Sequence, residues 1–362
     1  MRAPEMRYIP ALTGLRGIAA WWVVMYHFSE PLAGRAPEWM YDFIGKGYLA
    51  VDLFFVLSGY VIYVSYFESL HDFQWRSTAR FLINRLIRIY PLHLVILLLF
   101  LLNPLAIWLF SDSGVVSDRY SFDYFFASVF LFQNWGFFDD LQWNIPAWSI
   151  STEFAAYIVC PFLISFGIAK FRGSGVMALC GLFAGVAAIA ILFFAADKEA
   201  IGDGIPSLGV ARCVFEFWIG LCVGVLSKYR GIHSWQSELV CSFVLISLVA
   251  VIYFLVEFGV PDYFFIPLAF SLLLYVLIRG DLIFSRFLSF PFLHYMGLIS
   301  YSTYLVHYFI KDWVKFLSSS IGVYQFVVYL VLCAVASMVL YRFVEIPSRQ
   351  YLRIKFSHQA ND

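Results

Sequence analysis

Apolar residues fill this chain in runs of about 20, separated by short stretches rich in charged residues, proline or glycine. A helix of about 20 residues is what the hydrocarbon core of a bilayer requires. The pattern therefore predicts an all-α polytopic membrane protein. The predicted spans lie near residues 11–29, 47–67, 90–110, 147–168, 175–196, 206–227, 237–257, 262–279, 295–315 and 322–343.

One further apolar run, 122–134, has about 13 residues, which is too short to cross a bilayer. We expect it to form a re-entrant or interfacial helix. No internal repeat and no long hydrophilic segment is visible. About ten transmembrane helices then form a single domain over residues 1–356, and residues 357–362 form a short tail.

Basic residues indicate the orientation of these spans. With ten spans, sixteen Lys and Arg residues fall on one side of the bilayer and six on the other. Cytoplasmic connections of membrane proteins carry the excess of Lys and Arg. Both termini are therefore predicted to be cytoplasmic. If residues 122–134 also crossed the bilayer, every later connection would lie on the opposite side, and the difference in Lys and Arg counts between the two sides would largely disappear.

Composition agrees with a membrane protein and narrows its chemistry. The chain is 62% hydrophobic and 13% charged, with no net charge and a mean hydropathy of +0.80. The six cysteines lie inside apolar runs without a CxxC motif, so they indicate neither disulfides nor a metal site. We expect membrane lipid around the protein and no nucleic-acid partner.

The first predicted span contains RGIAAWWVVMYH, a segment with an ionisable residue at each end, Arg16 and His27. Eleven positions bring both side chains to one face of a helix, about 16 Å apart along its axis. A membrane helix with an arginine near the headgroups and a histidine at its far end would give the same pattern. Charged groups inside a bilayer are costly, however, and favour a functional role.

Three more ionisable residues are predicted in the outer half of the bilayer: Asp52, Glu153 and His307. Each has a structural alternative. The two carboxylates can pair with cations inside the membrane, and His307 can be a hydrogen-bonded core histidine. For Arg212 and Glu216, four positions apart in one span, we favour the structural interpretation.

On the inner side, the segment RSTARFLINRLIRIYP repeats arginines at helical spacing with no acidic residue among them. Arg85 and Arg88 are the two nearest the apolar part of the helix. They are either ligand-binding groups or basic anchors that fix the orientation of the span.

Six motifs of the chain resemble those of the bacterial acyltransferase-3 family. They are ALTGLRGIAAWWVVMYHF, VDLFFVLSGYVI, RFLINRLIRIYP, WSISTEF, GLISYSTYLVH and VEIPSRQYL, in the order of the family and over roughly residues 10 to 350. An arginine and a histidine with ten residues between them are the hallmark of that family. Thr13 stands where many members carry an acidic residue. We expect no appended extracellular hydrolase-like domain, and therefore no peptidoglycan-type acceptors that rely on one.

The resemblance implies an integral-membrane O-acyltransferase of the bacterial inner membrane. It implies transfer of an acyl group, commonly acetyl and sometimes succinyl, from cytoplasmic acyl-CoA to a hydroxyl. Acceptors in the family are mostly sugars of surface or secreted polysaccharides, including lipid-linked ones, and also macrolides and other small molecules. We expect acyl-CoA as a substrate and no permanently bound cofactor.

The motifs assign roles to individual residues under this resemblance. Arg85 and Arg88, with Tyr90 of the same motif and Ser58, are the expected donor-binding residues, because guanidinium groups suit the phosphates of CoA. Arg16 would hold or polarise the donor.

At the outer end of the first span, His27 would act as the general base or as an acyl-carrying nucleophile. Glu153 or Asp52 would fix its tautomer, and His307 is a further catalytic candidate.

Two other classes of membrane protein also place ionisable groups in the bilayer. A transporter usually has inverted repeats and broken helices, whereas no repeat is visible here. A structural or sensory protein needs no polar groups at one common depth. The sequence therefore favours an enzyme.

Overall fold

The computed structural model describes residues 9–111, 117–228, 244, 246–247, 252, 254–255, 258–278, 283–318 and 320–358. Within them the fold is all-helical, as predicted, and contains no β-strand. The α-helices are α1 (Pro10–His27), α2 (Glu38–Gly45), α3 (Ala50–Leu70), α4 (Trp75–Leu99), α5 (Leu102–Phe110), α6 (Phe122–Val129), α7 (Trp148–Phe162), α8 (Gly175–Ala195), α9 (Ile205–Leu226), α11 (Ile266–Ile278), α12 (Ile283–Leu288), α13 (Pro291–Leu298), α14 (Ser300–Leu317), α15 (Val323–Leu340) and α16 (Ile346–His358).

Short helical turns join or extend these helices. They are η1 (Glu30–Leu32), η2 (Gly47–Leu49), η3 (Asp118–Tyr120), η4 (Ile145–Ala147), η5 (Leu163–Gly167), η6 (Ile168–Phe171), η7 (Asp262–Phe264) and η8 (Tyr341–Glu345).

Six helical stretches in the described residues are long and apolar enough to cross a membrane. They are Glu38–Leu70, Trp75–Phe110, Ile145–Phe171, Gly175–Ala195, Ile205–Leu226 and Val323–Phe356. Each contains or matches one predicted span, namely those near 47–67, 90–110, 147–168, 175–196, 206–227 and 322–343. The chain is therefore a helical membrane protein.

The predicted count of ten spans is not confirmed. The predicted span near 262–279 corresponds to α11, which has only 13 residues. The predicted span near 237–257 lies largely outside the described residues. Helices α1 and α14 have 18 residues each, but polar side chains lower their hydropathy. The same polar side chains line the site described below.

Helix α4 extends beyond the third predicted span: that span begins near residue 90, whereas α4 begins at Trp75. The first half of α4 carries the arginines of the RFLINRLIRIYP motif, which precede the apolar run in the sequence. Arg85 and Arg88 are helical, as their spacing predicts, and line an internal cavity.

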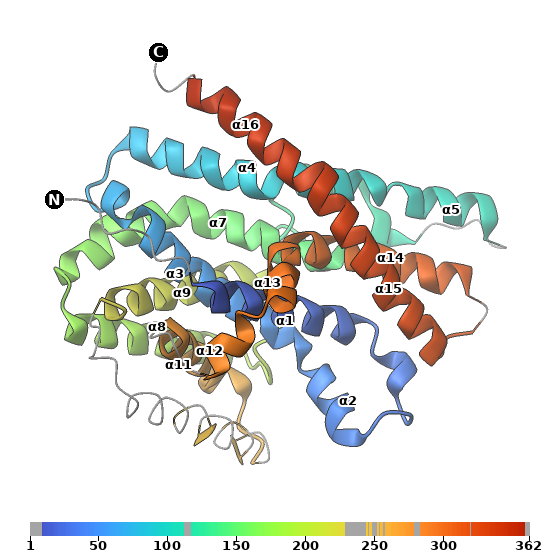
Figure 1. Ribbon diagram of the computed structural model, residues 1–362, viewed down its shortest axis with the longest axis horizontal. Helices are drawn as coiled ribbons and strands as arrows, with labels where there is room; N and C mark the ends of the chain where they lie inside the picture. Colours follow the sequence, from blue (N-terminus) through green and yellow to red (C-terminus); the bar gives the residue numbers. More distant parts are fainter. Residues whose placement is uncertain are drawn as a thin grey trace.

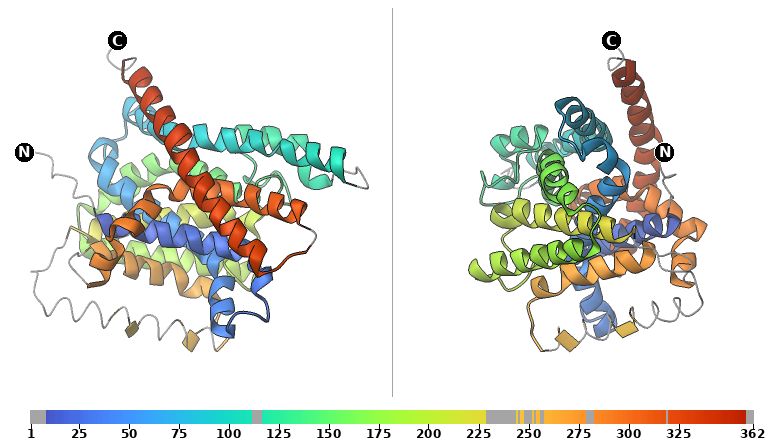
Figure 2. Two further views of the ribbon diagram at one scale, coloured as in Figure 1. Left: turned by 45° about the vertical axis from the view of Figure 1, so that its right-hand side comes forward. Right: turned by 90° about the vertical axis from the view of Figure 1, so that its left-hand side faces the viewer.

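The long helices lie mostly side by side, along the horizontal direction of Figure 1, with α1 near the middle of the bundle. Helix α1 contacts α3, α11, α13 and α14, and α9 contacts α3, α7, α8 and α11. One cluster of buried apolar side chains extends through these helices and α4. Helix α16 projects away from the body of the bundle, as both views in Figure 2 show.

The predicted short segment 122–134 begins with α6, which has eight residues and is followed by an irregular stretch up to η4. Leu131, Gln133 and Asn134 of this stretch are buried, and the stretch is bound to neighbouring helices. The backbone N–H of Asn134 donates to Ser151 Oγ at 3.1 Å, and its side-chain Nδ2 donates to the Ile205 carbonyl at 3.0 Å. The segment thus folds back against α7 and α9, and its helix is too short to cross.

Helices α3 and α9 approach each other at the level of their backbones, through two glycines. A Cβ atom on Gly220 would lie 2.0 Å from the Val56 carbonyl oxygen, and one on Gly59 would lie 2.2 Å from the Phe217 carbonyl oxygen. Close contact of this kind between membrane helices requires small residues. It places one wall of the cavity, which α3 supplies, against α9.

We expect Gly220→Ala to lower the stability of the protein by about 1–3 kcal/mol, because the added methyl group meets backbone rather than a movable side chain. The measurement is the thermal unfolding midpoint of the purified protein in detergent. Gly45→Ala is the matched control, since nothing lies within 4 Å of a Cβ at that position. Equal midpoints for the two variants would contradict the close packing of α3 on α9.

Candidate functional site

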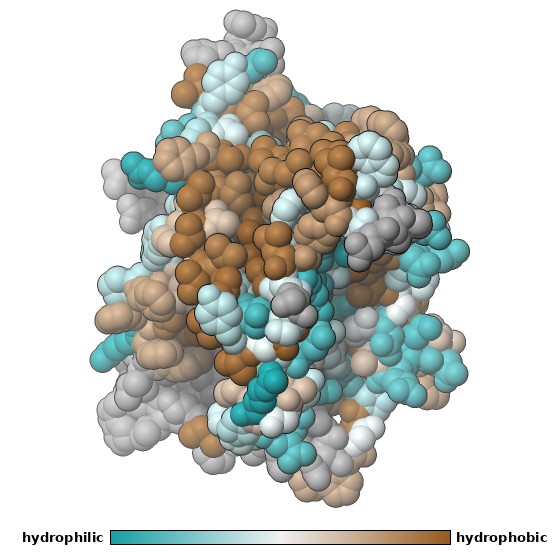
Figure 3. Space-filling view, turned by 90° about the vertical axis from the view of Figure 1, so that its right-hand side faces the viewer, coloured by the Kyte–Doolittle hydropathy of each residue, from teal (hydrophilic) through white to brown (hydrophobic). Residues whose placement is uncertain are grey.

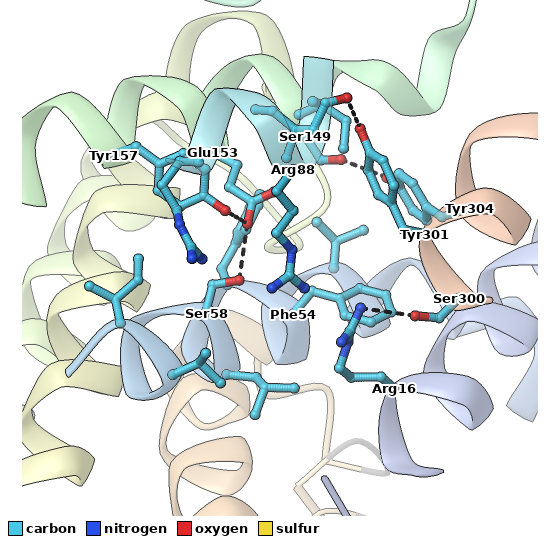
Figure 4. A pocket seen from close by; sticks show the side chains of 18 residues that line it. Arg16, Phe54, Ser58, Arg88, Ser149, Glu153, Tyr157, Ser300, Tyr301 and Tyr304 are labelled. Atoms are coloured by element: carbon cyan, nitrogen blue, oxygen red, sulfur yellow. Dashed lines mark hydrogen bonds between the residues drawn. The ribbon is translucent and has the colours of Figure 1, made fainter. Parts of the chain in front are cut away.

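A cavity of about 120 Å³ lies inside the bundle between α1, α3, α4, α7 and α14. Its polar lining is concentrated in a few side chains, shown in Figure 4. These are Arg16, Ser58, Arg85, Arg88, Ser149, Glu153, Tyr157, Ser300, Tyr301 and Tyr304. The cavity, lined by five helices, therefore gathers three guanidinium groups and one carboxylate from α1, α4 and α7.

Arg16 enters the cavity from α1 and binds to α14. Its Nη2 donates to Ser300 Oγ at 3.1 Å, and Ser300 Oγ in turn donates to the Gly297 carbonyl at 2.8 Å. A hydroxyl is a neutral partner, so Arg16 keeps its full charge toward the cavity. The structure thus places Arg16 where a ligand can reach it.

Glu153 lies opposite Arg16, on α7. Its Oε1 accepts hydrogen bonds from Ser58 Oγ at 3.0 Å and from the Tyr157 hydroxyl at 2.5 Å. Figure 4 shows the Arg88 guanidinium reaching into the centre of the cavity, between Glu153 and Arg16. Ser58, predicted as a donor-binding residue, lies in the cavity and holds the carboxylate.

Arg85 and Arg88 both line the cavity. Arg85 Nη2 donates to the Tyr66 hydroxyl at 3.0 Å, and its guanidinium lies 4.9 Å from the centre of the Tyr66 ring. The Arg85 Nε atom is buried and has no hydrogen-bond partner in the described part of the chain. Neither arginine forms an ion pair there that would mark it as a purely structural residue.

Tyr90 does not belong to this cavity. It lines an apolar groove beside Ile87 and Pro91, on another side of α4. Two positions along a helix rotate a side chain by about 200°, so Tyr90 and Arg88 face nearly opposite ways. Tyr90 and Arg88 were predicted together because they belong to one sequence motif, but they lie on different faces of α4. Tyr301 of α14 lies in the cavity instead, with its hydroxyl donating to the Ile89 carbonyl at 2.5 Å.

At the C-terminal end of α1, His27 meets His307 of α14. The two ring centroids are 5.1 Å apart, and the ring of Tyr308 lies edge-on to His27 at 5.3 Å. His307 Nδ1 is 2.6 Å from the Tyr304 carbonyl oxygen. A carbonyl only accepts, so Nδ1 carries the hydrogen, and Nε2 of the neutral ring keeps its lone pair. That Nε2 atom is buried without a partner among the described residues.

Tyr304 connects the cavity with the histidine pair. Its side chain lines the cavity, with the hydroxyl 2.8 Å from Ser149 Oγ and donating to the Pro146 carbonyl at 2.9 Å. Its backbone carbonyl holds His307 at the other end. Helices α1 and α14 thus contact each other at Arg16–Ser300 and again at His27–His307, the two ends predicted for one path.

Asp52 lies away from both groups. Its Oδ1 accepts from Arg212 Nη2 at 2.6 Å and from Nε at 2.7 Å, and both residues are buried. The structural alternative considered for Asp52 is therefore the one observed. The arginine pairs with Asp52 of α3, whereas the sequence suggested Glu216, its neighbour on α9.

Neither carboxylate expected to orient His27 contacts it. Asp52 is bound to Arg212, and Glu153 is bound to Ser58 and Tyr157. The aromatic rings against His27 are those of His307, Tyr308 and Tyr26. Tyr157 was not among the predicted site residues, although its position four residues after Glu153 on a helix could have indicated it.

Comparison with known proteins identifies the family of the chain. The sequence profile of the acyltransferase domain family, acyltransferase-3, matches residues 9–342. The chain belongs to the acyltransferase-3 family. The resemblance noted in the sequence is thus confirmed.

Two acyltransferase-3 relatives come from Staphylococcus aureus strain COL. The O-acetyltransferase OatA is 24% identical over 369 residues, which cover 95% of this chain and 58% of OatA. The putative O-acetyltransferase SACOL0978 is 24% identical over 370 residues, which cover 96% of this chain and 58% of that protein. The chain therefore spans less than two-thirds of the length of these relatives. No solved structure matches it.

We expect Arg212→Leu to reduce stability by about 3–5 kcal/mol, because it leaves the Asp52 carboxylate buried without its partner. The double variant Asp52→Leu/Arg212→Leu should recover part of this loss. Thermal unfolding in detergent measures both, and acyl transfer per folded molecule should stay near the parent value in the double variant. A stable double variant that has lost transfer would return Asp52 to the candidate site.

Proposed function

We propose that this acyltransferase moves an acetyl group from cytoplasmic acetyl-CoA to a hydroxyl of a surface or secreted polysaccharide. The observation that carries the proposal is the connection through Tyr304, between a cavity with three guanidinium groups and the His27–His307 pair. The names of the relatives, O-acetyltransferases, support acetyl as the acyl group and oxygen as the acceptor atom.

The cavity is the donor end of this path. Arg16, Arg85 and Arg88 face one carboxylate, so the cavity favours an anionic ligand. Guanidinium groups bind phosphate through paired hydrogen bonds, as the phosphates of CoA require. The excess of Lys and Arg predicted for the connections on this side supports a cytoplasmic entrance and cytoplasmic termini, in a bacterial inner membrane.

The histidine pair is the acceptor end. His27 takes the proton of the acceptor hydroxyl, and the oxygen attacks the thioester carbonyl. The carbon–sulfur bond breaks, the CoA thiolate leaves, and the proton returns to the sulfur. The products are an O-acyl ester and free CoA.

His307 orients the base. With its Nδ1 hydrogen donated to the Tyr304 carbonyl, its Nε2 lone pair is available to accept an N–H from His27. His27 then presents its other nitrogen, unprotonated, to the acceptor. His307 thus takes the orienting part that a carboxylate plays in a hydrolase triad.

We expect Arg88→Ala to weaken binding of acetyl-CoA about ten- to hundredfold, through loss of a charge-assisted contact worth about 1.5–3 kcal/mol. Isothermal titration of the purified protein measures the dissociation constant. Arg80→Ala is the matched control, since Arg80 lies on the same helix but is exposed. Unchanged binding in Arg88→Ala would leave this arginine as an anchor for the orientation of α4.

We expect His27→Gln to abolish acetyl transfer and to leave binding of acetyl-CoA within about twofold of the parent, because glutamine hydrogen-bonds but takes no proton. The loss would hold for direct transfer and for a route through acyl-His27 alike. Transfer is measured with radiolabelled acetyl-CoA in liposomes, with the surface variant His71→Gln as control. Substantial transfer by His27→Gln would remove His27 from the mechanism.

A further inference from the structure

A second pocket lies at the C-terminal end of α14, and the proposed donor path does not use it. Its volume is about 160 Å³. It is formed by α5, η3 and the last turns of α14. Four polar and three aromatic side chains line it: Asn103, Arg119, Asp312, Lys315, Tyr120, Trp313 and Phe316.

The polar groups of this pocket are held in fixed positions by one another. Arg119 Nη2 pairs with Asp312 Oδ2 at 2.6 Å, and Asn103 Nδ2 donates to the same oxygen at 3.2 Å. Trp313 Nε1 donates to Asn103 Oδ1 at 2.9 Å, which fixes the indole beside them. Both bonds to the carboxylate use Oδ2, so Asp312 Oδ1 is available to a ligand.

The pocket lies close to the histidine pair. The Arg119 guanidinium is 5.1 Å from the centre of the Tyr308 ring, and that ring is 5.3 Å from the ring of His27. Asp312 follows His307 by five residues on α14, a rise of about 7.5 Å. Lys315 of the pocket also pairs with Glu30 at 2.5 Å, just beyond the end of α1.

The rim of the pocket is open to the outside of the bundle. Lys315 and Phe316 are exposed, and Asp312 and Trp313 are half-buried. The end of the molecule seen in Figure 3 carries polar side chains beside a broad apolar area. A ligand with many hydroxyl groups can therefore enter here without crossing the apolar core.

We propose that this pocket binds one sugar ring of the acceptor and directs a hydroxyl of that sugar, or of its neighbour, toward His27. A sugar ring has apolar C–H faces and hydroxyl groups at its edge. The Trp313 indole suits such a face, and the neighbouring carboxylate, amide and guanidinium groups suit the hydroxyls. The proposal rests on the proposed function and adds to it the place where the acceptor binds.

The same hydrogen bonds could serve only to hold α5 against α14. Enzyme kinetics distinguish this structural role from binding of the acceptor. The probes are the methyl glycosides of glucose, galactose, N-acetylglucosamine and glucuronic acid, each as acceptor with acetyl-CoA as donor. For Trp313→Ala and for Asp312→Asn we expect KM for the acceptor to rise about tenfold. KM for acetyl-CoA and acetyl-CoA hydrolysis without acceptor should stay within about twofold of the parent.

Trp108→Ala is the matched control, because this tryptophan lies on α5 but is 65% exposed and outside the pocket. If these residues have only a structural role, the two substitutions would lower thermal stability and change KM for both substrates equally, and that result would overturn the proposal. A parent protein that hydrolyses acetyl-CoA but acetylates none of the glycosides would also overturn it, while the proposed function stands. Absence of donor binding and hydrolysis in the parent would instead remove the proposed function itself.

Discussion

The constraint on which this structure depends is the cost of an ionised side chain in a low-dielectric interior. The bundle meets it in two ways. Asp52 and Arg212 neutralise each other in a buried ion pair that joins α3 to α9. Arg16 and Arg88 have no such partner in the described residues and face an internal cavity instead. The buried Asp52–Arg212 pair thus belongs to the scaffold, whereas the unpaired arginines mark the place where an anionic ligand can be accommodated.

The sequence predicts the membrane fold well where hydropathy alone decides. The six candidate spans are helices of sufficient length and apolar composition. Three of them contain α3, α4 and α7, which line the cavity, so a few polar side chains do not hide a long apolar helix. Helices α1 and α14 are not among the six, because they are shorter and the polar residues that they bring to the site lower their hydropathy.

The site itself was predictable in part. Spacing on one helix correctly placed Arg16 and His27 on one face of α1, where both meet α14, since that relation is local. Which carboxylate faces which cation depends on how distant helices pack, and no local pattern contains it. The sequence analysis therefore assigned Asp52 to the candidate site, whereas in the structure Asp52 pairs with Arg212. Tyr90 was misplaced for a simpler reason, because a motif in the sequence does not separate the two faces of a helix.

The hydrogen bond that fixes the His307 ring ends on a backbone carbonyl, that of Tyr304. Every amino acid supplies such an oxygen, so the tautomer of His307 does not depend on the identity of the residue at position 304. The Tyr304 side chain faces the cavity and takes no part in this bond. Under the proposed function, substitutions at position 304 can therefore change the donor pocket and keep the orientation of His307 intact, because the two are connected through main chain rather than through side chains.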